Sequence, residues 1–163
     1  MDKNRKEKYQ DWPFIVVGCI VRKNNKFLLV QELKKDKGLW NHPAGWLEKG
    51  EDIISGAKRE VKEETGLDVE FKGLVGIFNL IKRNHPQLKD IHAVKLIFAA
   101  DTQKEDVKFD REELMDAKWF TREEIEKMGI DRLRDSDIKT AVRNFSDGKI
   151  FPLELINHQE VNY

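Results

Sequence analysis

Three glutamates near the middle of the sequence are spaced so that their carboxylates can act on one ligand. Glu60, Glu63 and Glu64 stand at positions i, i+3 and i+4, which share one face of an α-helix. Like charges at this spacing destabilise an isolated helix by about 0.2–0.5 kcal/mol, and the helix dipole disfavours anions in the last turn. A bound divalent cation would remove both penalties, and clustered carboxylate oxygens suit Mg²⁺ or Mn²⁺. The spacing therefore favours a metal site, although a solvated helix face is the alternative in a chain with 37% charged residues.

These glutamates belong to a longer pattern that runs from Gly45 to Leu67. The segment matches the Nudix box, G-x5-E-x7-R-E-U-x-E-E-x-G-U with U apolar, at every fixed position. At average amino-acid frequencies, a chance match within the chain has a probability of about one in a million. The pattern therefore excludes the solvated-face alternative, and the sequence is identified as a member of the Nudix hydrolase family.

The resemblance implies an α/β fold, a Nudix-type α/β/α sandwich with a mixed sheet, in which the box forms a loop–helix–loop catalytic motif. The metal-binding glutamates of the family match Glu60, Glu63 and Glu64. In several members the first of these, here Glu60, also serves as or orients the general base. Arg59 and Glu51 match a pair that positions the catalytic glutamates, and the carbonyl of Gly45 matches a backbone metal ligand.

Outside the box, four residues have both a functional and a structural interpretation. Glu113 matches a loop glutamate that adds a metal ligand or the base in many family members; the alternative is a solvated loop residue. Trp46 and Trp40 flank the start of the box and have rings that can stack on an aromatic substrate, or pack against the protein instead. His42 is expected to be a hydrogen-bonded structural histidine.

The elements that must position these residues follow from hydrophobic periodicity and turn signals. Ile54, Ala57 and Val61 form one apolar stripe of a helix, and Gly66 is suited to the position that follows it. The other expected elements are a hairpin of strands 14–22 and 27–31 with a turn at Asn24-Asn25, a loop at 33–41, strands 67–81 and 91–100 around a polar loop at 82–90, a strand at 117–120, a helix opened by a capping box at Thr121 and Glu124, and a helix around 135–145. Strands mixed with helices on both sides indicate an α/β sandwich.

Length and composition limit the remaining possibilities. The 163 residues fit one domain, expected at 12–163, behind a flexible tail at 1–11. Lysine plus arginine equals aspartate plus glutamate at 30 each, which argues against duplex nucleic acid as a partner and leaves a small anionic substrate possible. Cys19 is the single cysteine and is expected to be a buried apolar residue. The lack of a second cysteine, of a signal peptide and of a membrane span in the sequence favours a cytoplasmic protein. The protein is expected to be a monomer or weak homodimer.

A wider resemblance bears on the substrate. The segments 39–45 (LWNHPAG), Leu133-Arg134, 146–149 (SDGK) and 151–156 (FPLELI) are similar to those of bacterial NudJ-type phosphatases. This resemblance implies a metal-dependent hydrolase that attacks a phosphoanhydride of a small di- or triphosphate, either a nucleotide or a thiamine-precursor or thiamine diphosphate. The basic 82–90 segment departs from that group. The alternatives are a pyrophosphatase of ADP-ribose or a nucleoside diphosphate sugar, RNA 5′-end processing, and a non-catalytic ligand-binding regulator, a type that usually lacks box glutamates.

Overall fold

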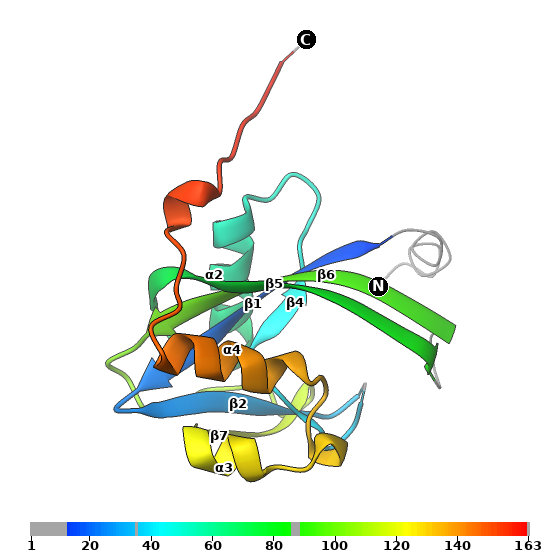
Figure 1. Ribbon diagram of the computed structural model, residues 1–163, viewed down its shortest axis with the longest axis vertical. Coiled ribbons are helices and arrows are strands. Elements are labelled where there is room, and N and C mark those ends of the chain that lie inside the picture. Colours follow the sequence, from blue (N-terminus) through cyan, green and yellow to red (C-terminus); the bar gives the residue numbers. More distant parts are fainter. Residues whose placement is uncertain (1–12, 35, 86–88, 163) are drawn as a thin grey trace.

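The computed structural model describes residues 13–34, 36–85 and 89–162 (Figure 1). The predicted flexible tail at 1–11 lies outside the described residues. The elements are β1 (Phe14–Lys23), β2 (Lys26–Glu32), β3 (Trp40–Asn41), β4 (Ala44–Trp46), α2 (Ile53–Thr65), β5 (Glu70–His85), β6 (Lys89–Asp101), β7 (Leu114–Thr121), α3 (Arg122–Lys127), η1 (Ile130–Arg132), α4 (Asp137–Ser146) and η2 (Leu153–Leu155). Of the helices described, none is long and apolar enough to cross a membrane.

One mixed sheet organises the fold. Its strands follow the order β3-β2-β1-β6-β5, with β4 paired to β1 and β7 paired to β2. The β1–β6 pair is parallel and the other strand pairs are antiparallel. The predicted hairpin between β1 and β2 is confirmed, because Asn24 and Asn25 take positive φ angles of 47° and 61° at its turn.

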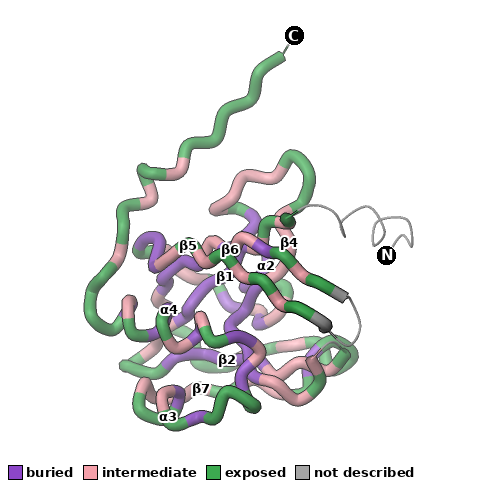
Figure 2. The backbone as a smooth tube through the Cα atoms, turned by 45° about the vertical axis from the view of Figure 1, so that its right-hand side comes forward, coloured by how far each residue is buried: buried purple, intermediate pink, exposed green. Residues whose placement is uncertain are grey.

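The sheet is covered on both faces, which confirms the predicted α/β/α sandwich. Alternation along β1 sends Cys19 toward α2 and Ile20 toward α4, and β6 divides its side chains in the same way. Ala57 and Val61 of α2 complete one hydrophobic cluster, while Ile138, Ala141, Val142 and Phe145 of α4 complete the other. Figure 2 shows the buried backbone concentrated between these layers. Cys19 is fully buried, as expected of a cysteine that acts as a small apolar side chain.

Both ends of α2 follow from local sequence. Asp52 is the N-cap, and its Oδ1 accepts a 2.8 Å hydrogen bond from the backbone N–H of Ser55. Gly66 adopts the left-handed conformation at φ 67°, and its N–H donates to the Lys62 carbonyl, so the helix stops there as predicted. The capping box at Thr121 and Glu124 is also present at the start of α3.

Two loop predictions are wrong. Residues 82–85 and 89–90, predicted as part of a polar loop, instead extend β5 to His85 and begin β6 at Lys89, and Lys82 pairs with Ile91. β5 is an edge strand of the sheet, where a charged side chain such as that of the exposed Arg83 is tolerated. The predicted loop at 33–41 ends in β3, where Gln31 of β2 pairs with Trp40.

Candidate active site

The start of the box and its helix meet at Gly45. Gly45 lies in β4 opposite Val17 of β1, and the carboxylate of Glu60 from α2 lies directly against it. A Cβ atom added to Gly45 would stand 2.2 Å from Oε2 of Glu60, so any side chain at this position would displace the carboxylate. The turn glycine of the box is therefore also the residue that lets a buried glutamate contact the backbone of β4.

Arg59 joins three acidic residues of the box into one network. Its Nε and Nη2 donate to the two carboxylate oxygens of Glu51 at 2.8 and 2.9 Å. Its Nη1 donates to Glu60 at 2.6 Å and to Glu63 at 3.1 Å, and Nη2 also donates to the carbonyl of Trp46 at 3.1 Å. These hydrogen bonds lower the pKa of Glu51. The geometry is that of a positioning residue, because each N–H of the guanidinium has an acceptor within the box.

Glu60 and Glu64 lie in surroundings that oppose their negative charge. Glu60 is 9% exposed, and burial raises its pKa above the ordinary value despite the neighbouring Arg59. Burial also raises the pKa of Glu64, to which the charges of Glu32 and Glu60 add. The backbone N–H of Ala44 donates to Glu64 at 3.1 Å and acts in the opposite direction. Two carboxylates of raised pKa on one wall are therefore poised to gain from a bound cation.

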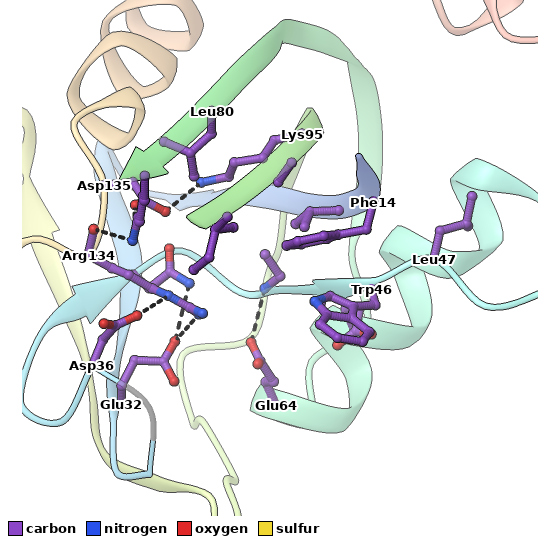
Figure 3. Close-up of a pocket in the computed structure, with 18 of the residues that line it drawn as sticks. Phe14, Glu32, Asp36, Trp46, Leu47, Glu64, Leu80, Lys95, Arg134 and Asp135 are labelled. Atoms are coloured by element: carbon purple, nitrogen blue, oxygen red, sulfur yellow. Dashed lines mark hydrogen bonds and ion pairs between the residues drawn. The ribbon is translucent and has the colours of Figure 1, made fainter. Parts of the chain in front are cut away.

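A cavity of about 580 Å³ opens onto this wall (Figure 3). Acidic residues outnumber basic ones in its lining by seven to four. They are Glu32, Asp36, Glu48, Glu60, Glu64, Glu113 and Asp135 against Lys34, Lys82, Lys95 and Arg134. An apolar part of the lining includes Trp46 and Phe14, whose ring centroids are 5.1 Å apart. The cavity thus combines a carboxylate wall with aromatic side chains.

The two predicted tryptophans have different places. Trp46 lines the cavity, as a residue that stacks on substrate must. Trp40 is 4% exposed and packs edge-on against Phe120, with ring centroids 5.0 Å apart, inside the α4 cluster. Of the two interpretations given for Trp40, the structure matches packing against the protein, and its ring does not line the cavity that a substrate ligand would need to reach.

His42 is fully buried, and its Nδ1 lies 3.2 Å from the carbonyl of Pro43. Burial and the nearby charge of Lys95 lower the pKa of His42 to about 4, so the ring is neutral at physiological pH. These contacts match the structural role expected of it. Glu113 stands at the cavity rim, where its side chain is 64% exposed and pairs with Lys34 at 2.5 Å. The structure therefore keeps Glu113 near the site without directing it to the glutamates of α2.

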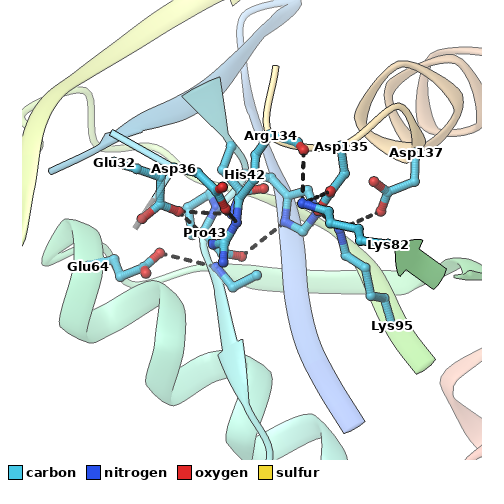
Figure 4. Close-up of polar contacts among 12 residues, drawn as sticks. Glu32, Asp36, His42, Pro43, Glu64, Lys82, Lys95, Arg134, Asp135 and Asp137 are labelled. Carbon is cyan, nitrogen blue, oxygen red and sulfur yellow. Dashed lines mark hydrogen bonds and ion pairs between the residues drawn. The ribbon is translucent and has the colours of Figure 1, made fainter. Parts of the chain in front are cut away.

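The wall opposite α2 contains residues that the motif analysis did not assign to the site (Figure 4). Asp135 forms ion pairs with Lys82 at 2.6 Å and with Lys95 at 3.1 Å, and Lys95 also pairs with Asp137 at 2.6 Å. Arg134 pairs with Glu32 and Asp36. These groups come from β2 and the loop after it, from β5 and β6, and from the segment before α4 and its first residue, so no local spacing marks them. The Leu133-Arg134 dipeptide was the one signal in the sequence.

The donor set suits a hard divalent cation. Glu60, Glu64 and the backbone of Gly45 offer only oxygen, and within the described residues no lysine or arginine forms an ion pair with Glu64. In the part of the chain that the structure describes, no three acidic, histidine or cysteine side chains already converge in a metal-binding geometry. Glu63 is turned toward Arg59 and would have to rotate away from it to join Glu60 and Glu64. The residues fit a cation after that one rearrangement.

The raised pKa of Glu64 generates a prediction about stability without metal. A carboxyl group whose pKa is higher in the folded state favours folding most below the ordinary value of 4.5, and this contribution is lost as the pH rises toward the folded-state pKa. In EDTA, Glu64→Gln should therefore leave the free energy of unfolding at pH 7 unchanged or raise it, and its advantage should vanish near pH 4.5. Urea unfolding at both pH values measures this. A loss of more than about 1 kcal/mol at pH 7 would show that the Glu64 carboxylate stabilises the metal-free fold.

Comparisons with known proteins identify the family of the chain. The family model for the NUDIX domain matches residues 12–141. Proteins named phosphatase NudJ from Shigella boydii serotype 4 (strain Sb227) and Escherichia coli (strain K12) are 33% and 32% identical over 145 residues, which cover 88% of this chain and 90% of each relative. A NUDIX hydrolase from Nitrosomonas europaea superposes with a TM-score of 0.72 at 27% identity, covering 91% of this chain and 98% of that structure. The chain therefore belongs to the Nudix family of hydrolases.

Proposed function

We propose that the protein uses Mg²⁺, or Mn²⁺, to hydrolyse a phosphoanhydride bond in a small diphosphate or triphosphate. The observation that carries this proposal is the convergence of Glu60, Glu64 and Gly45 on one wall of a cavity with excess acidic residues. Such a lining repels a phosphate chain unless a cation is bound there. The same lining with a divalent cation attracts phosphate.

The residues of α2 have separate roles in this proposal. Glu60, Glu64 and the carbonyl of Gly45 hold the cation, and Glu63 joins them after leaving Arg59. A bound Mg²⁺ supplies charge neutralisation and lowers the pKa of water. Glu60 accepts or directs the proton of the attacking water, which is the role that the resemblance implies for the first glutamate of the box. Arg59 and Glu51 keep these carboxylates in place.

The organic part of the substrate is proposed to lie on Trp46 and Phe14, which form the aromatic section of the lining. A nucleotide or a thiamine-precursor diphosphate has a suitable ring, and similarity to proteins named phosphatase NudJ favours release of a terminal phosphate. Glu113 is kept as a proposed additional ligand at the rim. A cytoplasmic location, a monomeric or weakly dimeric state and the absence of a duplex nucleic-acid partner stay predictions.

The function is tested by separating and identifying the products formed from nucleoside di- and triphosphates, thiamine diphosphate, ADP-ribose and a nucleotide sugar, with Mg²⁺ and with EDTA. Hydrolysis of the last two gives a nucleoside monophosphate and a sugar phosphate, and no inorganic phosphate. Release of inorganic phosphate that requires the metal is expected for the diphosphates. Glu64→Gln should lower turnover at least about 100-fold, since it weakens the cation site, while the exposed Glu123→Gln on α3 should match the wild type. Turnover of Glu64→Gln within threefold of wild type would remove Glu64 from the site. Turnover of ADP-ribose alone would support the pyrophosphatase alternative, and no metal-dependent turnover on any substrate would support a binding protein.

Arg59 should affect the rate of reaction more than the binding of substrate. It does not line the cavity, and its contacts are to Glu51, Glu60 and Glu63. Arg59→Ala is therefore expected to lower kcat about tenfold or more with KM changed less than threefold. Lys58→Ala, at the exposed neighbouring position, is the matched control. A tenfold rise in KM at constant kcat would instead identify Arg59 as a substrate-binding residue.

Trp46 should determine selectivity for the ring of the substrate. Stacking on a base contributes roughly 1–3 kcal/mol, so Trp46→Ala is expected to weaken aromatic diphosphates about tenfold. A small aliphatic diphosphate should lose less than twofold, because its phosphates bind elsewhere. KM values for both substrate types and the melting temperature are the measurements. Equal losses on both substrates with a lower melting temperature would show that Trp46 only packs against Phe14.

A further inference from the structure

Arg134 is fixed in the wall of the cavity that faces α2. Leu133 forms a parallel bridge with Trp40, and the backbone N–H of Arg134 donates to the Trp40 carbonyl at 2.9 Å. The segment before α4 is therefore attached to the short strand β3. Its backbone holds the side chain inside the cavity, where 28% of that side chain is exposed.

Two carboxylates orient the guanidinium of Arg134. Nη1 donates to Oε1 of Glu32 at 2.7 Å, and Nε donates to Oδ2 of Asp36 at 3.0 Å. Asn41 donates to the same Glu32 oxygen at 3.3 Å, so Glu32 is itself held. The structure gives no acceptor for Nη2 among the described residues, although an arginine can donate from every guanidinium nitrogen. Figure 3 shows the side chain extending past Glu32 and Asp36 into the cavity.

Arg134 and Glu64 line the same cavity from different elements, Arg134 from the segment before α4 and Glu64 from α2 (Figure 3). A phosphate chain bound through a cation at the α2 carboxylates would therefore lie in the same cavity as the guanidinium of Arg134.

The other cations of the lining are already engaged. Lys34 pairs with Glu113 at the rim. Lys82 and Lys95 share Asp135, and Lys95 pairs with Asp137 as well. Arg134 differs from the lysines in its planar guanidinium, which two ion pairs orient and whose Nη2 has no acceptor among the described residues. A guanidinium arranged in this way recognises phosphate oxygens well.

We propose that Arg134, oriented by Glu32 and Asp36, binds the phosphate chain of the substrate from the wall opposite α2. The inference rests on the proposed function, because it takes a di- or triphosphate as the ligand. It assigns to Glu32 and Asp36 the task of orienting the arginine. Substrate phosphate then lies between the cation held by α2 and the guanidinium of Arg134.

The test measures binding without hydrolysis, so that its result does not depend on turnover. Methylene diphosphonate, whose P–C–P bridge resists hydrolysis, is titrated by calorimetry into the protein with Mg²⁺. Arg134→Gln is expected to weaken binding at least tenfold. Arg132→Gln, at an exposed neighbouring position, should change it less than twofold. Arg134→Lys keeps the charge and loses the planar fork, so a loss of threefold or more is expected, and it serves if Arg134→Gln does not fold.

The double variant Glu32→Gln/Arg134→Gln separates phosphate binding from charge balance. If Arg134 contacts phosphate, the double variant stays at least tenfold weaker than Glu32→Gln. Recovery of wild-type affinity in the double variant would show that Arg134 only neutralises Glu32 and would overturn the inference. So would binding by Arg134→Gln within twofold of wild type, or no binding of the diphosphonate by the wild type. Failure of the proposed function appears separately, as diphosphonate binding without turnover of any substrate.

Discussion

The carboxylates of Glu60 and Glu64 are held where the protein has removed most of their water, and the surroundings are arranged around this unfavourable placement. Burial raises the pKa of both groups. Arg59 offsets part of the charge on Glu60, and the Ala44 N–H offsets part of that on Glu64. Neither contact fully compensates the negative charge of its carboxylate, so a bound cation would stabilise the site by adding the missing positive charge.

The fold supplies this placement through β4 and α2. Pairing of β4 with β1 holds Gly45 next to α2. The packing of Ala57 and Val61 against the sheet holds α2 in place, and with it the position of Glu60 relative to Gly45. Gly56 contributes at the same interface: a Cβ there would stand 2.7 Å from Oε2 of Glu51, the partner of Arg59. Gly45 and Gly56 therefore leave room for the carboxylates of Glu60 and Glu51. At both positions the lack of a side chain matters for packing as much as for backbone conformation.

Much of this arrangement could be predicted from the sequence, because the box residues lie within one short segment. The helix and its end at Gly66 follow from local spacing, and the contact between Arg59 and Glu51 was implied by the resemblance to the family. The opposite wall could not be predicted in this way. Glu32, Lys82, Lys95 and Arg134 meet through strand pairing and through the docking of Leu133 on β3, which depend on tertiary packing. Trp40 shows the same limit, since its neighbour Phe120 comes from a distant strand.

We propose that a divalent cation binds between Glu60, Glu64 and the carbonyl of Gly45. A crystal structure with Mn²⁺ tests this proposal, because the anomalous scattering of Mn²⁺ locates the ion independently of the protein atoms. We expect one ion or more with oxygen ligands from Glu60 and Glu64 at about 2.0–2.3 Å, and with Glu63 released from Arg59. Anomalous density elsewhere, or a Glu63–Arg59 contact and empty carboxylates at saturating Mn²⁺, would contradict it.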